Sequence, residues 1–201
     1  MIHYFLLIFS FFTFISNSYA TQVLPMDARQ MTYTADLVAY GIFLGSEPTE
    51  VEDPDNGKKL PATLYHFEKK ECLKGDCSAK ISFLQFGATR RNAEGLKRLY
   101  VHGTPDLKVG KEYLIFLTPK ASGTGFRSFV GLGQGRFEVR QDATGNKSVV
   151  NDFNNEDLFK VLSPAKGIGT GTKDVAPEMP GRGPVSYDQF KTLIQDWNKE
   201  K

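Results

Sequence analysis

One short segment of the chain has an apolar or aromatic residue at every position. It spans Tyr113–Leu117, reads Tyr-Leu-Ile-Phe-Leu and follows two charged residues. A strand with apolar side chains on both faces must be covered on both faces. We therefore predict that Lys111–Thr118 is a central strand of a sheet. Pro119 is expected to end it, because proline cannot donate to the strand ladder.

Several other short strands are predicted around this one. Leu37–Leu44 is a continuous apolar run with Gly41 in its middle, where a bulge or bend is expected. The remaining strands are Ala62–Glu71, Ala79–Phe86, Phe126–Val130, Arg136–Arg140 and Lys147–Val150. Many short strands separated by turn residues indicate a sandwich or a small closed or partly open barrel. The predicted fold class is therefore mainly β.

Three segments between the strands are expected to lack regular structure. Gly45–Pro61 contains three prolines and little that is apolar, so we predict a long exposed loop. Gly87–Lys111 is predicted to be a connection. Ser163–Val185 is rich in proline and glycine and is predicted to be a poorly ordered linker. The connection carries a basic cluster that we expect to be solvated, with a binding role as the alternative: Arg90, Arg91, Lys97 and Arg98.

Two helices are predicted. The first is a short one over Asp27–Thr34. The second lies in residues 186–201, where Ser186 can cap a helix with Gln189 three residues further on. Its apolar residues are spaced by three, four and three and form one stripe: Tyr187, Phe190, Ile194 and Trp197. We expect this helix to dock on the barrel, and the alternative is a tethered helix that binds a partner.

The first residues are typical of a secretory signal peptide. Residues 1–20 contain no Lys, Arg, Asp or Glu, and the apolar run Phe5–Ile15 is too short to span a bilayer. Ser18 and Ala20 provide the small residues that precede a cleavage site, so we predict a cut between Ala20 and Thr21. An uncleaved anchor is the alternative, because no Lys or Arg precedes the apolar run. The predicted location is secreted or periplasmic, with no stable membrane span after cleavage.

Length and charge limit the remaining possibilities. We predict a signal peptide over 1–20, one barrel domain over 21–162, a linker over 163–185 and a helix over 186–201. The net charge is +2, from 25 basic and 23 acidic side chains. Such a balance does not favour nucleic acid as a partner. A monomer is expected.

The only cysteines, Cys72 and Cys77, flank the four residues Leu73–Asp76, which we predict to be a hairpin turn. In an oxidising compartment this pattern favours a disulfide between them. Closing so small a ring stabilises a fold by about 2 kcal/mol in the chain-entropy model. Free thiols are the alternative. The spacing differs from the C-x-x-C of redox sites, and a zinc site would need a second pair of ligands.

No catalytic, cofactor or metal site is predicted, and the ligand-binding residues are unknown from the sequence. The glycine-rich segment Gly131–Gly135 is similar to a phosphate loop, but it precedes a strand pattern instead of a helix. Beyond the signal peptide only His66 and His102 remain, and their spacing does not define a site. His66 is expected on a strand surface. The chain is therefore predicted to be non-enzymatic.

Three stretches resemble the netrin-like module, whose best-known members are the tissue inhibitors of metalloproteinases. They are Ala35–Gly41, Tyr65–Gly75 and Gly110–Leu117. The region Met31–Val150 also resembles a set of uncharacterised exported bacterial proteins. The resemblance implies a short helix followed by a five-stranded barrel of the OB type. Those inhibitors clasp zinc with an N-terminal cysteine, which has no counterpart in a chain that begins at Thr21.

The leading hypothesis is an exported binding domain whose partner is a protease or another exported protein. The segment Gly45–Pro61 corresponds to a region that touches proteases in the inhibitors. One alternative is a cell-envelope hydrolase that uses the carboxylates of Asp106, Glu112 and Glu138. Another is a surface protein that binds glycan on the barrel face.

Overall fold

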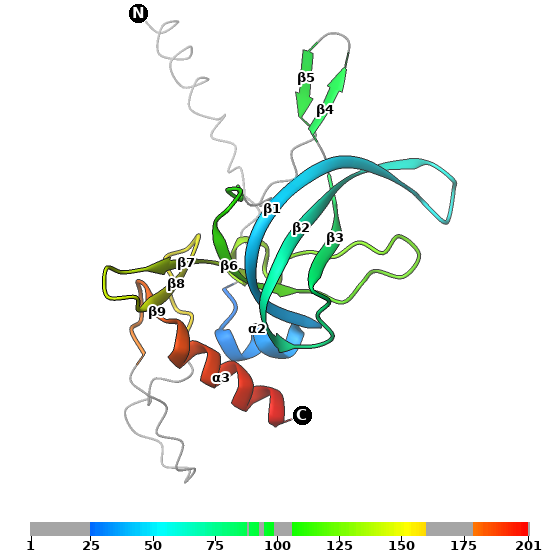
Figure 1. Ribbon diagram of the computed structural model, residues 1–201. Coiled ribbons are helices and arrows are strands. Elements are labelled where there is room, and N and C mark those ends of the chain that lie inside the picture. The colour runs from blue at the N-terminus through cyan, green and yellow to red at the C-terminus, as the bar shows by residue number, and fades with distance from the viewer. Residues whose placement is uncertain (1–24, 88, 93–94, 99–105, 160–178, 201) are drawn as a thin grey trace, which may run out of the picture.

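Seven strands form one antiparallel sheet in the computed structural model, which describes residues 25–87, 89–92, 95–98, 106–159 and 179–200. The strand order is β3-β2-β1-β6-β7-β8-β9 (Figure 1). The strands are β1 (Leu37–Glu52), β2 (Lys59–Lys74), β3 (Lys80–Phe86), β6 (Glu112–Leu117), β7 (Arg136–Gln141), β8 (Lys147–Asn151) and β9 (Val185–Ser186). The prediction of a mainly β fold is confirmed.

The central position predicted for Lys111–Thr118 is also confirmed, because β6 is the middle strand of the sheet. Its residues from Tyr113 to Leu117 are all buried. Alternate side chains enter two different cores. Tyr113, Ile115 and Leu117 join a barrel-side core, whereas Leu114 and Phe116 join a helix-side core. Both faces of this strand are therefore covered by protein, as its sequence requires.

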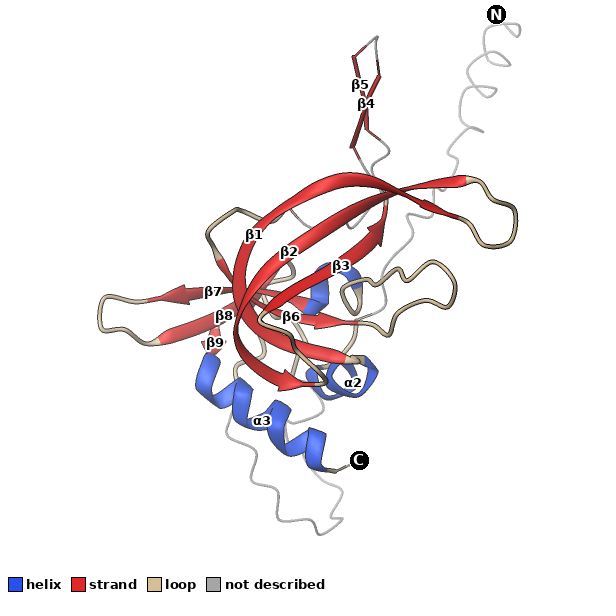
Figure 2. Cartoon of the chain, turned by 45° about the vertical axis from the view of Figure 1, so that its right-hand side comes forward, coloured by secondary structure: helices blue, strands red, loops and turns tan. Residues whose placement is uncertain are grey.

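The seven-stranded sheet is open, and the barrel-side core, so named for its place, lies inside the curved part of this sheet, where β1, β2, β3 and β6 wrap around it (Figure 2). It is rich in aromatic rings. Tyr65 stacks on Phe83 with ring centroids 5.3 Å apart, and Phe83 meets Phe129 edge-on at 5.4 Å. Offset stacks and edge contacts of this kind are the favoured geometries of aromatic pairs.

Strand β1 bends at Gly41, as predicted. The β1–β2 register shifts between Tyr40 and Gly41. A Cβ atom added to Gly41 would lie 2.4 Å from the carbonyl oxygen of Glu68 in β2. The two backbones can approach this closely only because residue 41 has no side chain.

The prediction of a long loop over Gly45–Pro61 is wrong. β1 continues to Glu52 and β2 begins at Lys59, so only residues 53–58 form a turn. We call residues 45–60 the β1–β2 arm. Most of its side chains are exposed. It therefore lacks the hydrophobic alternation by which a half-buried strand is recognised, and prolines are tolerated because it is a ribbon with open edges.

Two other predictions need correction. Residues 87–111 were expected to be a plain connection, but β4 (Thr89–Asn92) and β5 (Gly95–Arg98) form a separate two-stranded sheet. The side chains of its basic cluster lie outside the described part of the chain. Phe126–Val130 is not a regular strand. It makes one isolated bridge to each of two neighbours, from Phe126 to Leu84 and from Phe129 to Leu117. Neither bridge is extended into a continuous strand ladder.

Two helices cover the other side of the sheet. α2 (Ala28–Thr34) is capped by Asp27, whose side chain accepts a hydrogen bond from the Gln30 amide. α3 (Tyr187–Lys199) is capped by Ser186, which accepts one from the Gln189 amide, as predicted. Side-chain caps of this kind satisfy amides that the first turn leaves without partners.

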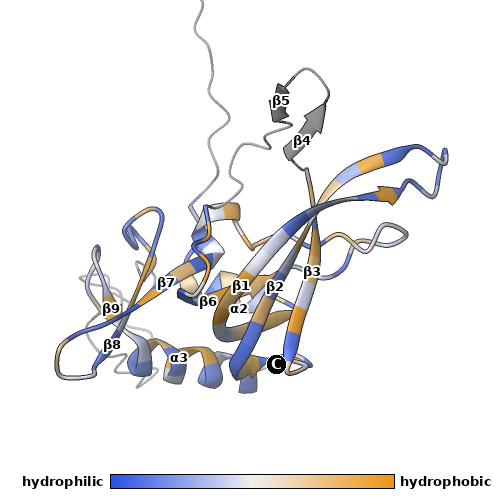
Figure 3. Cartoon of the chain, turned by 45° about the horizontal axis from the view of Figure 1, so that its top comes forward, coloured by the Kyte–Doolittle hydropathy of each residue, from blue (hydrophilic) through white to orange (hydrophobic). Residues whose placement is uncertain are grey.

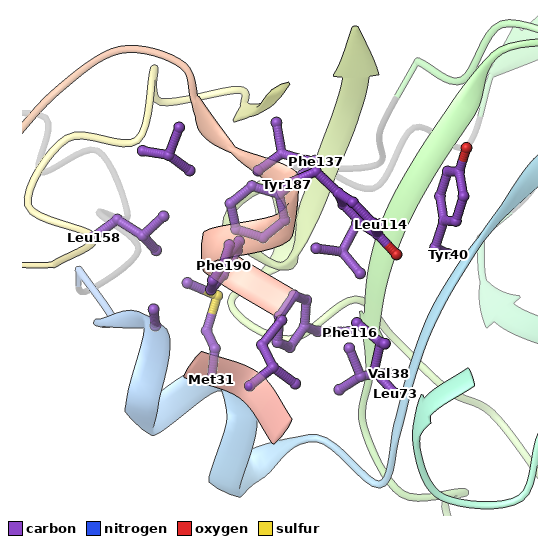
Figure 4. Close-up of a cluster of buried hydrophobic side chains, with 14 of the residues drawn as sticks. Met31, Val38, Tyr40, Leu73, Leu114, Phe116, Phe137, Leu158, Tyr187 and Phe190 are labelled. Carbon is purple, nitrogen blue, oxygen red and sulfur yellow. The ribbon is translucent and has the colours of Figure 1, made fainter. Parts of the chain in front are cut away.

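The C-terminal helix docks on the sheet, as expected. All four residues of its apolar stripe are buried in the helix-side core, and Figure 4 shows two of them, Tyr187 and Phe190, among the side chains of that core. The ring of Phe190 lies 5.9 Å from that of Phe116 and 5.2 Å from that of Phe137. The other end of α3 is tied to α2, since Arg29 and Tyr33 both donate to Glu200, at 2.5 and 2.6 Å.

Part of the expected linker also packs against the body. Residues 163–178 lie outside the described chain, as do the expected signal peptide and its cleavage site. Met179 and Val185, however, are buried in the helix-side core, and Val185 pairs with Val149 of β8. Within the described residues, no helix is long and apolar enough to cross a membrane.

Replacing Phe190 by alanine should lower the free energy of unfolding by about 3–5 kcal/mol, because it empties a fully buried aromatic site. Urea denaturation followed by circular dichroism measures this loss. The control is Gln195→Ala on the exposed face of the same helix, which should change stability by less than about 0.5 kcal/mol. Equal effects of the two substitutions would contradict the docked position of α3.

Candidate functional site

A polar pocket of about 480 Å³ lies beside the barrel-side core, next to the part of β7 and β8 that extends past this core. Its lining comes from the segment before β6, from β6 itself, from β7, and from the end of β8 with the turn that follows. The lining residues are Asp106, Lys108, Tyr113, Arg136, Glu138, Arg140, Val150, Asn151, Asp152 and Asn154. We call this the Arg136 pocket.

Strand alternation explains why β7 forms the floor of the pocket. Arg136, Glu138 and Arg140 lie on one face of β7. Phe137 and Val139 point the other way and are buried in the helix-side core. The core thus fixes the strand, and the charged side chains are displayed on its opposite face in alternating sign.

Arg136 connects the walls of the pocket. Its side chain is only 8% exposed, and it forms an ion pair with Asp152. It also donates to the backbone carbonyl of Asp106 at 3.0 Å, and its guanidinium lies 5.9 Å from the centre of the Tyr113 ring. Its Nε is buried without a hydrogen-bond partner among the described residues. One buried cation therefore holds three separate segments.

The other charges of the pocket are more exposed and balance one another. Arg140 forms an ion pair with Glu138 at 3.1 Å, and both side chains are at least 40% exposed. Lys108 and Asp106 are exposed at the rim. The pocket is therefore lined by three cations and three carboxylates, and its formal charge is zero.

The turn after β8 forms one wall and has an unusual backbone. Asn154, Asn155 and Asp157 have φ angles of 54°, 56° and 57°. Asn and Asp adopt this left-handed region more readily than other residues that carry a side chain. The Asn155 side chain is fully buried, accepts from the Asn151 amide and donates to the carbonyls of Val149 and Gly183, all at 2.9 Å. The wall is thus set by internal hydrogen bonds.

The glycine-rich segment beside the pocket has a packing role, as predicted. A short 3-10 helix, η1 (Leu132–Gly135), leads directly into β7. A Cβ on Gly135 would lie 2.3 Å from the carbonyl oxygen of Val130. The glycine allows this tight approach of backbone to backbone, and the segment does not open an α-helix that could hold a phosphate.

The three carboxylates considered for hydrolysis do not all lie in one site. Asp106 and Glu138 line the Arg136 pocket. Glu112 accepts from the Tyr40 hydroxyl at 2.6 Å and lies 3.8 Å from Lys147, outside the pocket. Burial raises the pKa of Tyr40, and its hydrogen bond to Glu112 raises it further. This hydroxyl therefore stays protonated, and the contact joins β1 to β6.

A second polar contact ties α3 to β2. Glu71 accepts from the Tyr187 hydroxyl at 2.8 Å and forms an ion pair with Lys191. Burial on its own would raise the pKa of Glu71, but the hydrogen bonds from Lys191 and Tyr187 outweigh it and lower the pKa. This carboxylate therefore anchors the helix while ionised.

The predicted cysteine pair is at disulfide distance, with the sulfurs of Cys72 and Cys77 2.09 Å apart. His66 lies on the outer face of β2, as predicted, with Nδ1 2.8 Å from the Ser82 hydroxyl and Nε2 3.5 Å from Glu47. His102 lies outside the described residues. Within the described part, no group of three His, Cys, Asp or Glu side chains is arranged to hold a metal ion.

Searches against known protein families and against curated proteins find no match to this chain. The resemblance to netrin-like modules therefore remains a prediction. Sequence reasoning missed Arg136, Asp152 and Asn154 as members of one site. The available signal was the run Arg136–Arg140, in which charged side chains of alternating sign are separated by apolar ones.

Replacing Asn155 by alanine should destabilise the fold by about 3 kcal/mol, because backbone groups of residues 149, 151 and 183 lose buried hydrogen bonds. Thermal unfolding of the purified protein measures the effect. Asn198→Ala on the exposed face of α3 is the control and should be nearly neutral. A neutral result for Asn155→Ala would show that the turn does not depend on this side chain.

Proposed function

We propose that this protein is an exported, non-enzymatic domain that binds another exported protein through its β1–β2 arm. The observation that carries the proposal is the acidic arm, whose outer part from Glu50 onward extends beyond β3 and the rest of the sheet as a two-stranded ribbon (Figure 2). Its partner would be a protein with a basic surface, and an exported protease is one candidate.

The arm leaves one strand edge open. β1 pairs with β6 from Leu37 to Ile42, and beyond Gly45 the described chain pairs it only with β2. The backbone groups along the free edge of Gly45–Glu52 are therefore available to an extended segment of a partner. Addition of a strand to an open edge is a common mode of protein recognition.

The charge of the arm supports a basic partner. Its hydrophilic residues are concentrated toward the tip (Figure 3). Two lysines, Lys58 and Lys59, are outnumbered by five carboxylates, which are Glu47, Glu50, Glu52, Asp53 and Asp55. This local excess of negative charge contrasts with the net charge of +2 of the whole chain. It would attract a positively charged surface and speed encounter with it.

The tip of the arm is ordered before any partner binds. In the turn, Asp53 accepts from the Asp55 amide at 3.0 Å and from the Asn56 side chain at 2.8 Å. A Cβ built on Gly123 would lie 2.7 Å from Pro54 Cγ, so the turn touches the loop over residues 119–125. A pre-formed surface loses less conformational entropy on binding.

We further propose that β1, β2, β3, β6 and the segment Phe126–Val130 together form a barrel of the OB type. β1, β2 and β3 are followed around the ring by Phe126–Val130 and β6, and β6 returns to β1. The Arg127 amide donates to the Leu84 carbonyl at 2.7 Å, and the Val130 amide donates to the Phe116 carbonyl at 2.9 Å. These contacts support a five-membered ring. In OB folds the loops that would correspond to residues 53–58 and 119–125 contact ligands.

Shortening the arm should abolish partner binding. Residues Glu50–Pro61 are replaced by Asn-Gly, which joins the paired residues Thr49 and Ala62 by a two-residue hairpin turn. The processed chain is cross-linked to the exported proteins of its source cell, and captured proteins are quantified by mass spectrometry. We expect the partner captured by the intact chain to fall at least tenfold with the shortened arm.

A charge variant tests the proposed chemistry. Glu52→Lys combined with Asp55→Lys should reduce capture to a similar extent, and higher salt should weaken capture by the intact chain. The matched control is Glu156→Lys with Asp196→Lys, which changes the net charge equally on exposed sites outside the arm. Capture that is unaffected by the shortened arm, or the absence of a captured partner, would overturn the proposal. Hydrolysis of a cell-envelope substrate by the processed chain would favour the alternative function.

The proposed export of the chain leads to a separate prediction about cleavage of the signal peptide. When the full chain is produced with its first twenty residues, mass spectrometry of the exported protein should find Thr21 at the N-terminus. Ala20→Leu should prevent this cut, because signal peptidase requires a small residue there. Ser10→Leu in the apolar run is the control and should leave the cut in place. An exported chain that still begins at Met1 would contradict cleavage.

A further inference from the structure

We infer that the Arg136 pocket is a second binding site, independent of the β1–β2 arm, for a small neutral saccharide. The pocket is a half-open depression, and its volume of about 480 Å³ falls in the usual range for small-molecule sites. Its polar groups converge from three parts of the chain onto one space, held together by Arg136.

The balance of charge favours a neutral ligand. Three cations and three carboxylates line the pocket, so an ion of either sign would meet as much repulsion as attraction. Hydroxyl groups both donate and accept hydrogen bonds, and they can therefore use both kinds of side chain at once. A ligand with many hydroxyls and no charge suits this lining better than an anion or a cation.

The ion pairs leave hydrogen-bonding capacity for such a ligand. Asp152 uses one carboxylate oxygen in its ion pair with Arg136, and its side chain is 46% exposed. Glu138 uses one oxygen toward Arg140 and is 40% exposed. A carboxylate has about four acceptor positions, so each of these groups can accept further bonds from hydroxyls. Charged acceptors form stronger hydrogen bonds than neutral ones.

Internal hydrogen bonds also hold the walls of the pocket. Arg136 is buried and bonded to two walls, and the Asn154 wall is fixed by the hydrogen bonds of the fully buried Asn155. Left-handed backbone at consecutive non-glycine residues is costly and is often found where a site must hold its shape. Polar groups that are already in place bind a ligand with a smaller loss of entropy.

The test uses the processed chain and defined probes. Glucose, galactose, N-acetylglucosamine and cellobiose are titrated as neutral saccharides, glycylglycine as a zwitterion and gluconate as an anion. Protein-observed nitrogen-15 NMR gives the affinity and location. At least one neutral saccharide should bind and shift the Arg136 Nε and Asn154 side-chain signals, both of which belong to the pocket lining.

Matched substitutions assign the effect to the pocket. Glu138→Ala should weaken saccharide binding at least tenfold. Glu68→Ala should leave it unchanged, because Glu68 forms a similar ion pair two residues along its own strand, with Lys70 at 3.4 Å, but does not line the pocket. The chain with the shortened arm should bind saccharide normally, which separates this site from the proposed protein-binding function.

Several results would overturn the inference. These are tighter binding of glycylglycine or gluconate than of every neutral saccharide, absence of binding by all four saccharides, or equal weakening by Glu68→Ala and Glu138→Ala. Signal shifts confined to the arm would also overturn it, because they would place the saccharide outside the Arg136 pocket.

Discussion

The pairing of β1 with β6 is the contact on which the rest of the structure depends. Six residue pairs connect the two strands, from Leu37–Leu117 to Ile42–Glu112. Because side chains alternate along a strand, this one ladder supplies both cores: Leu37 and Ala39 enter the barrel-side core, and Val38 and Tyr40 enter the helix-side core. A defect in either core would therefore disturb the other.

The position of the Arg136 pocket follows from this arrangement. β7 and β8 continue the sheet beyond β6, and the helix-side core covers only one of their faces. The other face extends past the barrel-side core and carries charged residues. The same strands thus provide a rigid apolar support on one side and an accessible polar floor on the other. A polar site built on a packed strand holds its geometry better than one built on a free loop.

Features with a buried face were predictable from the sequence. The apolar stripe of α3 and the central strand β6 have strong local signals. The turn predicted over Leu73–Asp76 begins later than expected, because β2 continues to Lys74 and β3 starts at Lys80. The β1–β2 arm has no such signal in its sequence, because its pairing buries little apolar surface. The pocket was also hidden: Asp106, Arg136 and Asp152 are far apart in sequence, and only the folded sheet brings them together. The spacing of residues along the sequence therefore does not indicate this pocket.

The docking of α3 affects the order in which the protein can complete its fold during synthesis. Leu114 and Phe116 of β6 are fully buried, and Phe190 covers Phe116 from a helix made much later. Until α3 has been synthesised, the outer face of the central strand lacks the part of its cover that Phe190 supplies, so a nascent chain cannot complete its helix-side core.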